Sequence, residues 1–375
     1  MTLARDGACE EPVPTYANAT RTLRRTAPGI DIHLNQPAGL AARGPSVLIP
    51  RKKHPVTHLV QTMAFVGQTP WHDLGNRLAP NQPIGVWSRE AGMDWRILSS
   101  PVCYQPEGEQ PPPLHFDDHK VLYRSDTNAP LSVVSSRYQV VQPGEVLEFF
   151  RDLTEASGFE LETAGILKQG KKFWALARTG QSTLLKGSDA VNGFLLLATS
   201  CDGSLATIAM PTTVRVVCNN TLAIALSNSI GAVKVPHRSA FDSNAVKRQL
   251  GIAVSQWDGF MVRMKALAER KVSTTEAQRY ITRVVCDVAR NAPLPSAVSH
   301  QRALKRVEEL FNGSGRGAEL AAAKGTAWGL MNAVTEFVDH ERRARSQEYR
   351  LDSAWFGQGA TIKQRALEQA LQLVD

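Results

Sequence analysis

Basic and aromatic side chains alternate in a short stretch near the middle of the chain. Lys171 and Lys172 directly precede Phe173 and Trp174, and Arg178 follows four residues later. On a strand, cationic side chains can follow phosphates while an aromatic ring stacks on an unpaired base. The stretch therefore indicates a site for single-stranded nucleic acid, with Trp174 as the stacking ring. The alternative is that Trp174 belongs to the core and the lysines are only hydrated.

Three further cations lie in places where a charge needs a partner. Arg215 is the only charged residue of an apolar, strand-like run, and Lys234 and Arg238 bound the basic loop KVPHR. An isolated arginine among apolar residues must be paired or must reach a ligand. An internal salt bridge and a phosphate contact both stay open for Arg215. The residues that we expect to contact phosphate are Lys171, Lys172, Arg178, Arg215, Lys234 and Arg238.

Charge is unevenly distributed along the chain. The formal net charge is +8, but residues 63–162 carry −7 and residues 163–272 carry +9. A segregated basic segment suggests a polyanionic partner such as DNA. The alternative is that the acidic and basic segments face each other, within one subunit or between subunits of a homo-oligomer.

The familiar motifs of metal sites and enzymes are missing. The run from His115 to His119 (HFDDH) fits no strong zinc spacing, and we interpret it as a solvated turn before a strand over 120–124. The glycines of 312–317 are not followed by the Lys-Ser/Thr pair of a phosphate loop, and no GxSxG or HExxH occurs. We therefore expect no metal, no cofactor and no catalysis, with unrecognised carboxylate chemistry as an alternative.

Composition predicts a soluble protein of the cytoplasm. The five cysteines are widely spaced and form no CxxC, which is typical of reduced thiols. No run of about 18 apolar residues is present, as a membrane span would need. The first 25 residues lack the apolar core of a secretory signal. Residues 1–62 have no sustained period, and we expect a disordered arm or an upstream extension of the reading frame.

The pair Asp202-Gly203 lies between two apolar runs and predicts the central hairpin. Its arms are expected at 194–200 and from 205 towards 218, joined by a type I′ turn in which both central residues have positive φ. Pro211 interrupts the second arm and indicates a bulge, an edge or a strand start. From Asn219 onward we expect a helix.

The remaining pattern places strands before helices. A second hairpin is predicted over 160–167 and 171–178, after a strand over 131–141 and a helix over 144–157. Strands followed by helices favour an α+β fold, here a hairpin-rich antiparallel sheet followed by a helical C-terminal half. The predicted division is an arm over 1–62, a sheet-rich domain over 63–235 and a helical region over 236–375 that packs on it. Helices are expected over 241–271, 273–290, 297–311, 319–340 and 361–373.

Five sequence motifs together resemble one family. They are MAFVGQTPWHDLG at 63–75, VVSSRYQVVQP at 133–143, TTVRVVCNNTL at 212–222, GTAWGLMNAVTEFVDH at 325–340 and LDSAWFGQGA at 351–360. From residue 63 onward the chain is similar to the phage/plasmid-like protein family, which is classified as domain of unknown function 932. The resemblance implies a phage, plasmid or other mobile-element setting. It implies no activity and no set of catalytic residues.

These observations lead to one expected function and two alternatives. We expect a non-catalytic DNA-binding protein of mobile-element recombination or replication. By analogy of fold alone, it would resemble the single-strand annealing proteins of the Red-beta and Erf type, a homo-oligomer holding single-stranded DNA in a basic groove. The first alternative is a protein-interaction or structural module without nucleic acid. The second is an enzyme with carboxylate chemistry.

Overall fold

The computed structural model describes most of the chain from residue 62 onward. The described residues are 62–67, 75–107, 112–215, 217, 220–223, 232–254, 257–288, 292–293 and 300–375. The arm predicted over 1–62 lies outside them except for its last residue, and so does Asn219, from which a helix was expected. Residues Val56–Asp375 form one compact unit, to which the predicted sheet-rich and helical regions both belong.

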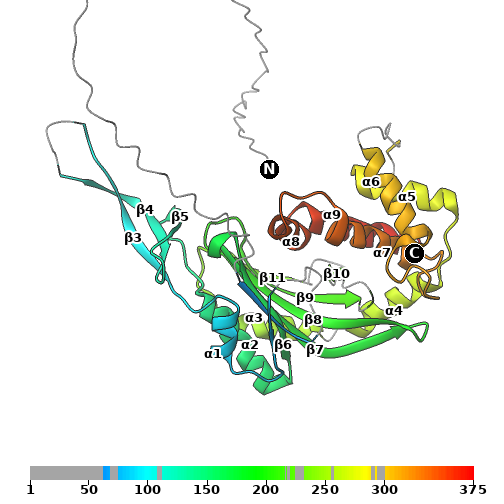
Figure 1. Ribbon diagram of the computed structural model, residues 1–375, viewed down its shortest axis with the longest axis horizontal. Coiled ribbons are helices and arrows are strands. Elements are labelled where there is room, and N and C mark those ends of the chain that lie inside the picture. The colour runs from blue at the N-terminus through cyan, green and yellow to red at the C-terminus, as the bar shows by residue number, and fades with distance from the viewer. Residues whose placement is uncertain are drawn as a thin grey trace, which may run out of the picture. The chain divides into compact units, whose positions relative to one another are not determined.

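An eight-stranded sheet forms the centre of this unit (Figure 1). The strand order is β10-β9-β8-β7-β6-β1-β2, and β11 pairs with β9. All pairs are antiparallel except β1 with β2. The strands are β1 (Thr62–Val66), β2 (Asn76–Leu78), β6 (Glu160–Leu167), β7 (Lys172–Leu185), β8 (Asp189–Ser200), β9 (Thr207–Arg215), β10 (Asn220–Ala223) and β11 (Val233–Val235).

The central hairpin is present as β8 and β9, but two details of its prediction were wrong. Six residues connect the strands, and of the pair Asp202-Gly203 only Gly203 has positive φ, so the turn is not type I′. The Asp202 carboxylate instead accepts the Ser204 N–H at 2.9 Å, which closes a local side-chain turn. Residues 220–223 form strand β10 rather than the start of a helix. Pro211 lies between the stretches of β9 that pair with β10 and β11.

The second predicted hairpin is β6 and β7, joined by a tight turn over 168–170. Three successive residues of this turn have left-handed backbones: Lys168 (φ 52°), Gln169 (φ 62°) and Gly170 (φ 91°). Such conformations are unfavourable for residues other than glycine and persist only where the surroundings impose them. Here the Lys168 N–H donates to the Glu348 carboxylate, and the Gln169 carbonyl accepts from Arg124.

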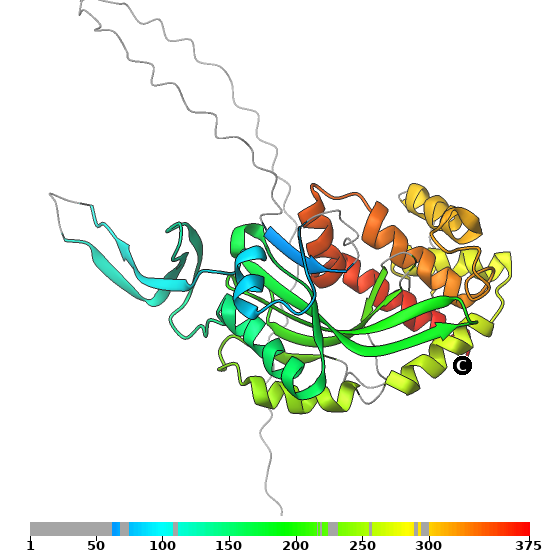
Figure 2. The same ribbon diagram turned by 60° about the horizontal axis from the view of Figure 1, so that its bottom comes forward.

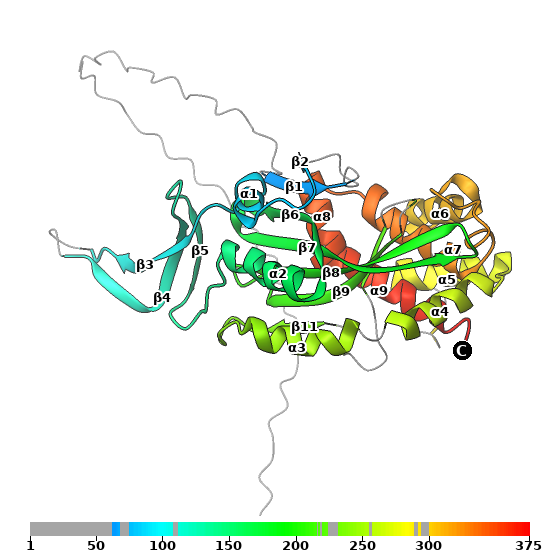
Figure 3. The ribbon, with the colours of Figure 1, turned by 90° about the horizontal axis from the view of Figure 1, so that it is seen from below.

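A three-stranded arm leaves the main sheet near this turn (Figures 1 and 3). It consists of β3 (Ile97–Tyr104), β4 (Leu114–Arg124) and β5 (Pro130–Ser135), in the order β3-β4-β5. The run from His115 to His119 lies inside β4, so its interpretation as a turn was wrong. An irregularity in the pairing opposite Pro101/Val102 accommodates the polar residues of this run without ending the strand.

Helices cover both faces of the main sheet. On one face, α2 (Pro143–Ser157) packs against β6 and β7, and α3 (Ser243–Val254) packs against β9, so that they cover alternate residues of these strands, among them Ala175 and Ala209. The other face presents Trp174, Ala198 and Ile208 in register to α8 (Gln347–Phe356). This alternation follows from the two-residue period of a strand, and it explains why the strands are apolar on both sides.

The helical C-terminal half packs around the far end of the β7–β8 hairpin, which confirms the α+β prediction (Figure 2). The helix expected over 241–271 is two helices, and the one expected over 319–340 begins only at Ala327, where Thr326 provides the N-cap. In the described residues, no helix has both the length and the apolar character that a bilayer crossing needs. The remaining helices are α1 (Ile84–Glu90), α4 (Trp257–Glu269), α5 (Thr274–Cys286), α6 (Gln301–Glu309), α7 (Ala327–Glu336) and α9 (Gln358–Leu371), with one turn of 3-10 helix at η1 (Lys168–Gly170) and π-helical turns at η3 (Leu310–Ser314) and η4 (Phe337–Glu341).

The start of α5 predicts a pH-dependent stability. The Ser273 backbone N–H donates to Glu276 at 2.8 Å and Arg270 donates to it as well, and these bonds lower the pKa of Glu276 from 4.5 to about 2. Because the folded-state pKa is the lower one, the stabilisation is present above pH 4.5 and is lost as the pH falls towards 2. We expect Glu276→Ala to lower Tm at pH 7, and the difference from wild type to shrink between pH 4.5 and 2 in thermal melts. A difference that persists at pH 2 would contradict this assignment.

Candidate nucleic-acid interface

Two turns meet at one end of the main sheet, and basic residues gather around them. The Cys201 N–H, in the β8–β9 loop, donates to the carbonyl of Lys171 at 2.8 Å, next to the β6–β7 turn. Lys234 on β11 lies opposite Ile208 on β9, close to the same loop. The chain after β11 then places a ring nitrogen of His237 2.8 Å from the Leu205 carbonyl.

A stacked pair of rings fixes the outer part of this site. His237 lies against Tyr138 with ring centroids 4.4 Å apart, and the Tyr138 hydroxyl donates to the Ser200 carbonyl at 3.0 Å. Burial raises the pKa of Tyr138 to about 12, so the hydroxyl keeps its proton at neutral pH. The stack brings the segments that carry Arg137 and Arg238 to the end of β8.

We call the exposed or half-exposed cations at this end the turn cluster: Arg137, Lys171, Lys234 and Arg238. Lys171 is half-buried and the other three are exposed. Within the described residues, no ion pair engages any of the four. Burial acts to raise the pKa of nearby Asp202, but hydrogen bonds from Ser204 and neighbouring charge leave it below its usual value. Asp202 is therefore ionised and offsets part of the positive potential.

Two of the residues expected to bind nucleic acid are enclosed beneath α8. Lys172 is 5% exposed, and its Nζ lies 2.6 Å from Oδ1 of Asp352, whose other oxygen is 2.7 Å from Nζ of Lys168. Trp174 is 4% exposed and packs on Trp355 with ring centroids 5.5 Å apart. Its indole therefore has no free face on which a base could stack.

Arg215 lies inside a buried network. Its Nε and Nη2 atoms bind the Asp189 carboxylate at 2.7–2.9 Å, and Nη2 also donates to the Gly317 carbonyl at 3.0 Å. The indole N–H of Trp328 donates to the same carboxylate at 2.9 Å. Asp189 is fully buried and Arg215 is 3% exposed, so of the two possibilities left open for this arginine the structure contains the salt bridge.

Arg178 is intermediate between these cases. Its Nη2 lies 2.8 Å from Glu162 on the neighbouring strand, and 41% of the side chain is exposed. Burial raises the pKa of Glu162, although Arg178 acts in the opposite direction. The structure thus gathers three of the seven expected residues, Lys171, Lys234 and Arg238, at one end of the sheet and engages the other four in ion pairs or in the core.

The sequence prediction missed Arg137 as a member of this site. Arg137 directly precedes Tyr138, so it shows the same basic-aromatic adjacency that singled out Lys172 and Trp174. It was assigned to the interior of a strand over 131–141, but β5 ends at Ser135. A predicted strand that ended at Ser135, as β5 does, would have placed Arg137 in the turn that follows.

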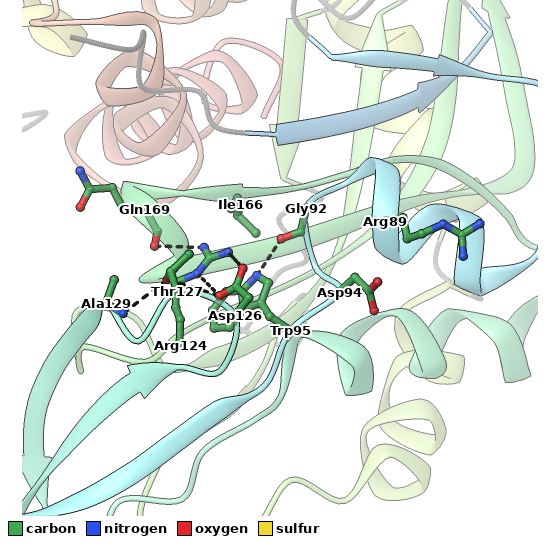
Figure 4. A pocket seen from close by; sticks show the side chains of 10 residues that line it. All are labelled: Arg89, Gly92, Asp94, Trp95, Arg124, Asp126, Thr127, Ala129, Ile166 and Gln169. Atoms are coloured by element: carbon green, nitrogen blue, oxygen red, sulfur yellow. Dashed lines mark hydrogen bonds and ion pairs between the residues drawn. The ribbon is translucent and has the colours of Figure 1, made fainter. Parts of the chain in front are cut away.

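Apart from the turn cluster, a hollow lies where the arm joins the main sheet. It has a volume of about 440 Å³, and Figure 4 shows Arg124 within reach of both Asp126 and the Gln169 carbonyl. The Arg124 guanidinium also lies over the Trp95 ring, 4.1 Å from its centroid. Arg89 and Arg124 are balanced by Asp94 and Asp126 among the lining residues, so this hollow has no surplus charge for an anion.

A metal site is not formed by the part of the chain that is described, where no three His, Cys, Asp or Glu side chains come together in a suitable group. A family model described as "Domain of unknown function (DUF932)" matches residues 130–355, which include β5 of the arm, strands β6 to β11 of the main sheet and most of the helical half. Comparisons with curated proteins and with solved structures found no match.

Proposed function

The chain belongs to the family defined by this domain of unknown function (DUF932), and we propose that it is a non-catalytic DNA-binding protein whose turn cluster binds phosphates of single-stranded DNA. The setting that we propose is the recombination or replication of a phage, plasmid or other mobile element, in the cytoplasm. We further propose that the protein acts as a homo-oligomer, because four cations on one subunit provide only a short phosphate-binding track.

One observation supports the proposal above the others. Arg137, Lys171, Lys234 and Arg238 come from four separate segments of the chain, yet they surround one pair of turns and lack ion pairs within the described region. Like charges at one end of the sheet that Asp202 offsets only in part repel each other, and a bound polyanion relieves that repulsion. Lys172 and Arg215 are held in buried ion pairs, so their charges are not available to DNA.

Charge reversal in the turn cluster tests the proposal. We expect the triple variant Lys171→Glu, Lys234→Glu and Arg238→Glu to lose most of its affinity for a fluorescent single-stranded oligonucleotide in anisotropy titrations. Each phosphate contact on a single strand contributes a slope of about −0.7 to log K against log salt. Four contacts therefore predict a wild-type slope of about −3. The variant keeps one of the four cations, so its slope should lie between 0 and about −1.

A control variant with the same change in net charge distinguishes loss of a localised binding site from a general loss of electrostatic attraction to DNA. Lys265, Arg279 and Arg302 are exposed on α4, α5 and α6, at the helical end of the molecule. Their reversal to Glu should leave both the affinity and the slope close to wild type. Equal losses in the two triple variants would contradict a localised site. Absence of salt-dependent binding by wild type would favour the alternative of a protein-interaction module.

A further inference from the structure

The outer part of the arm is a two-stranded ribbon with one apolar face. In the part of β4 that does not pair with β5, Phe116 lies opposite Val102 of β3 and Leu114 lies opposite Tyr104. Paired residues and residues two apart share one face of a strand, so these four side chains lie together. Tyr104, Leu114 and Phe116 are 52%, 45% and 46% exposed, which is unusual for adjacent large apolar residues.

The opposite face of the ribbon is polar, and two of its side chains interact with each other. Cys103 and His115 are paired there, with Sγ 3.4 Å from Nδ1. An isolated two-stranded ribbon is only marginally stable in water. A ribbon with one bare apolar face is therefore expected to be completed by a partner that covers that face.

A hollow of matching character lies elsewhere on the same chain, between β9 and β11 on one side and α8 and α9 on the other. Its volume is about 400 Å³, and Ile208, Met210, Trp355 and Phe356 give it an apolar lining. The indole nitrogen of Trp355 is buried and has no hydrogen-bond acceptor among the described residues. An occupant that brings an acceptor, such as a strand carbonyl, would satisfy this donor.

The charges of ribbon and hollow are complementary. The described outer ribbon, over 101–107 and 112–118, contains the acidic residues Glu107, Asp117 and Asp118 and no lysine or arginine. The charged residues that line the hollow are Lys234 and Lys363, with no carboxylate among the lining residues. Lys363 is already paired with Asp339 at 2.7 Å, so the cation that the hollow offers to the ribbon is Lys234, which the hollow shares with the turn cluster.

We propose that the β3–β4 ribbon of one copy docks, through Tyr104, Leu114 and Phe116, in the β9–α8–α9 hollow of a second copy. The arm points away from α8 and α9 in Figures 1 and 3, so a chain does not fill its own hollow. The contact joins two different surfaces, and repetition of such a contact gives a ring or a filament rather than a twofold dimer. The inference rests on the self-association proposed above and specifies its interface.

Complementation between two defective variants tests this docking without nucleic acid. The ribbon variant combines Leu114→Glu with Phe116→Glu, and the hollow variant is Ala360→Glu, at a small residue of α9 that lines the hollow. Each places a charge in the apolar contact and should weaken association by about a hundredfold or more. By light scattering after size exclusion, we expect each variant alone to be monomeric. An equimolar mixture should form a 1:1 dimer, because one copy has an intact ribbon and the other an intact hollow.

The control is His115→Glu, which adds one negative charge, as Ala360→Glu does, but on the opposite face of the ribbon, and which should assemble like wild type. Thermal melts of all variants establish that each is folded. A monomeric wild type at every concentration would overturn the self-association itself. Assembly of both defective variants like wild type would overturn only the docking, and so would a mixture that stays monomeric, since a contact between two ribbons cannot be complemented by an intact hollow.

Discussion

Replacing Asp189 by alanine is expected to lower the free energy of unfolding by about 3–5 kcal/mol, because it leaves the buried guanidinium of Arg215 without its counter-ion. The Asp189 carboxylate accepts from Arg215 and from the Trp328 indole at a fully buried position. Urea denaturation at pH 7, followed by circular dichroism, measures the loss. The isosteric change Asp189→Asn should also destabilise, since it removes the charge but keeps the volume.

An exposed ion pair provides the matched control. Lys324 and Glu319 lie 2.7 Å apart, with 68% and 65% of their side chains exposed. Lys324→Ala should leave the free energy of unfolding close to the wild-type value, because water and salt screen an exposed ion pair. If Asp189→Ala cost no more than this control, Arg215 would have found another partner or water, and the network would not have the structural role that its geometry indicates.

Trp174→Ala is expected to destabilise the fold by about 3–5 kcal/mol, the usual cost of deleting a buried tryptophan. The ring lies between the sheet and α8, in contact with Trp355, and its removal leaves a cavity at that junction. Urea denaturation measures the effect. We expect the milder variant Trp174→Phe to remain folded and to bind single-stranded DNA as wild type does, because the ring is enclosed between the sheet and α8.

The two readouts distinguish a core tryptophan from a stacking tryptophan. Stacking contributes about 1–3 kcal/mol per base, so a stacking ring would show its loss in affinity at unchanged stability. If the affinity of Trp174→Phe fell tenfold in the anisotropy titration while its unfolding midpoint stayed at the wild-type value, α8 would have to move aside on binding. The core assignment of Trp174 would then be wrong.

Local signals predicted those elements that depend on local interactions. Helix α2 begins at Pro143 behind a capping box and ends at Gly158 in the left-handed conformation, close to the bounds predicted. The helix predicted over 273–290 is α5, which begins directly after an N-cap at Ser273. In both cases the residues that define the helix end are within a few positions of each other, so their pattern is readable along the chain.

The partners of charged residues could not be predicted in the same way. Arg215 pairs with a carboxylate 26 residues earlier, and Lys172 pairs with one 180 residues later. A count of charges over 163–272 treats both as available to a ligand, although the fold neutralises them internally. The same holds for the HFDDH run, which pairing with β3 converts into strand despite its polar composition. Long-range pairing decides these cases, and a single sequence contains no direct signal for it.

The contact of α8 with the β6–β7 turn has a consequence for synthesis of the protein. Lys168 and Lys172 receive their counter-ion, Asp352, only after about 180 further residues have been translated. Until then the left-handed turn lacks the Glu348 carboxylate as an acceptor. The face of the sheet that contains Trp174 also remains exposed to water. Contacts of such separation form slowly, so the nascent chain carries this face of the sheet uncovered from the completion of β9 until α8 has been synthesised. We expect it to depend on chaperones that shield apolar strands until the last helices leave the ribosome.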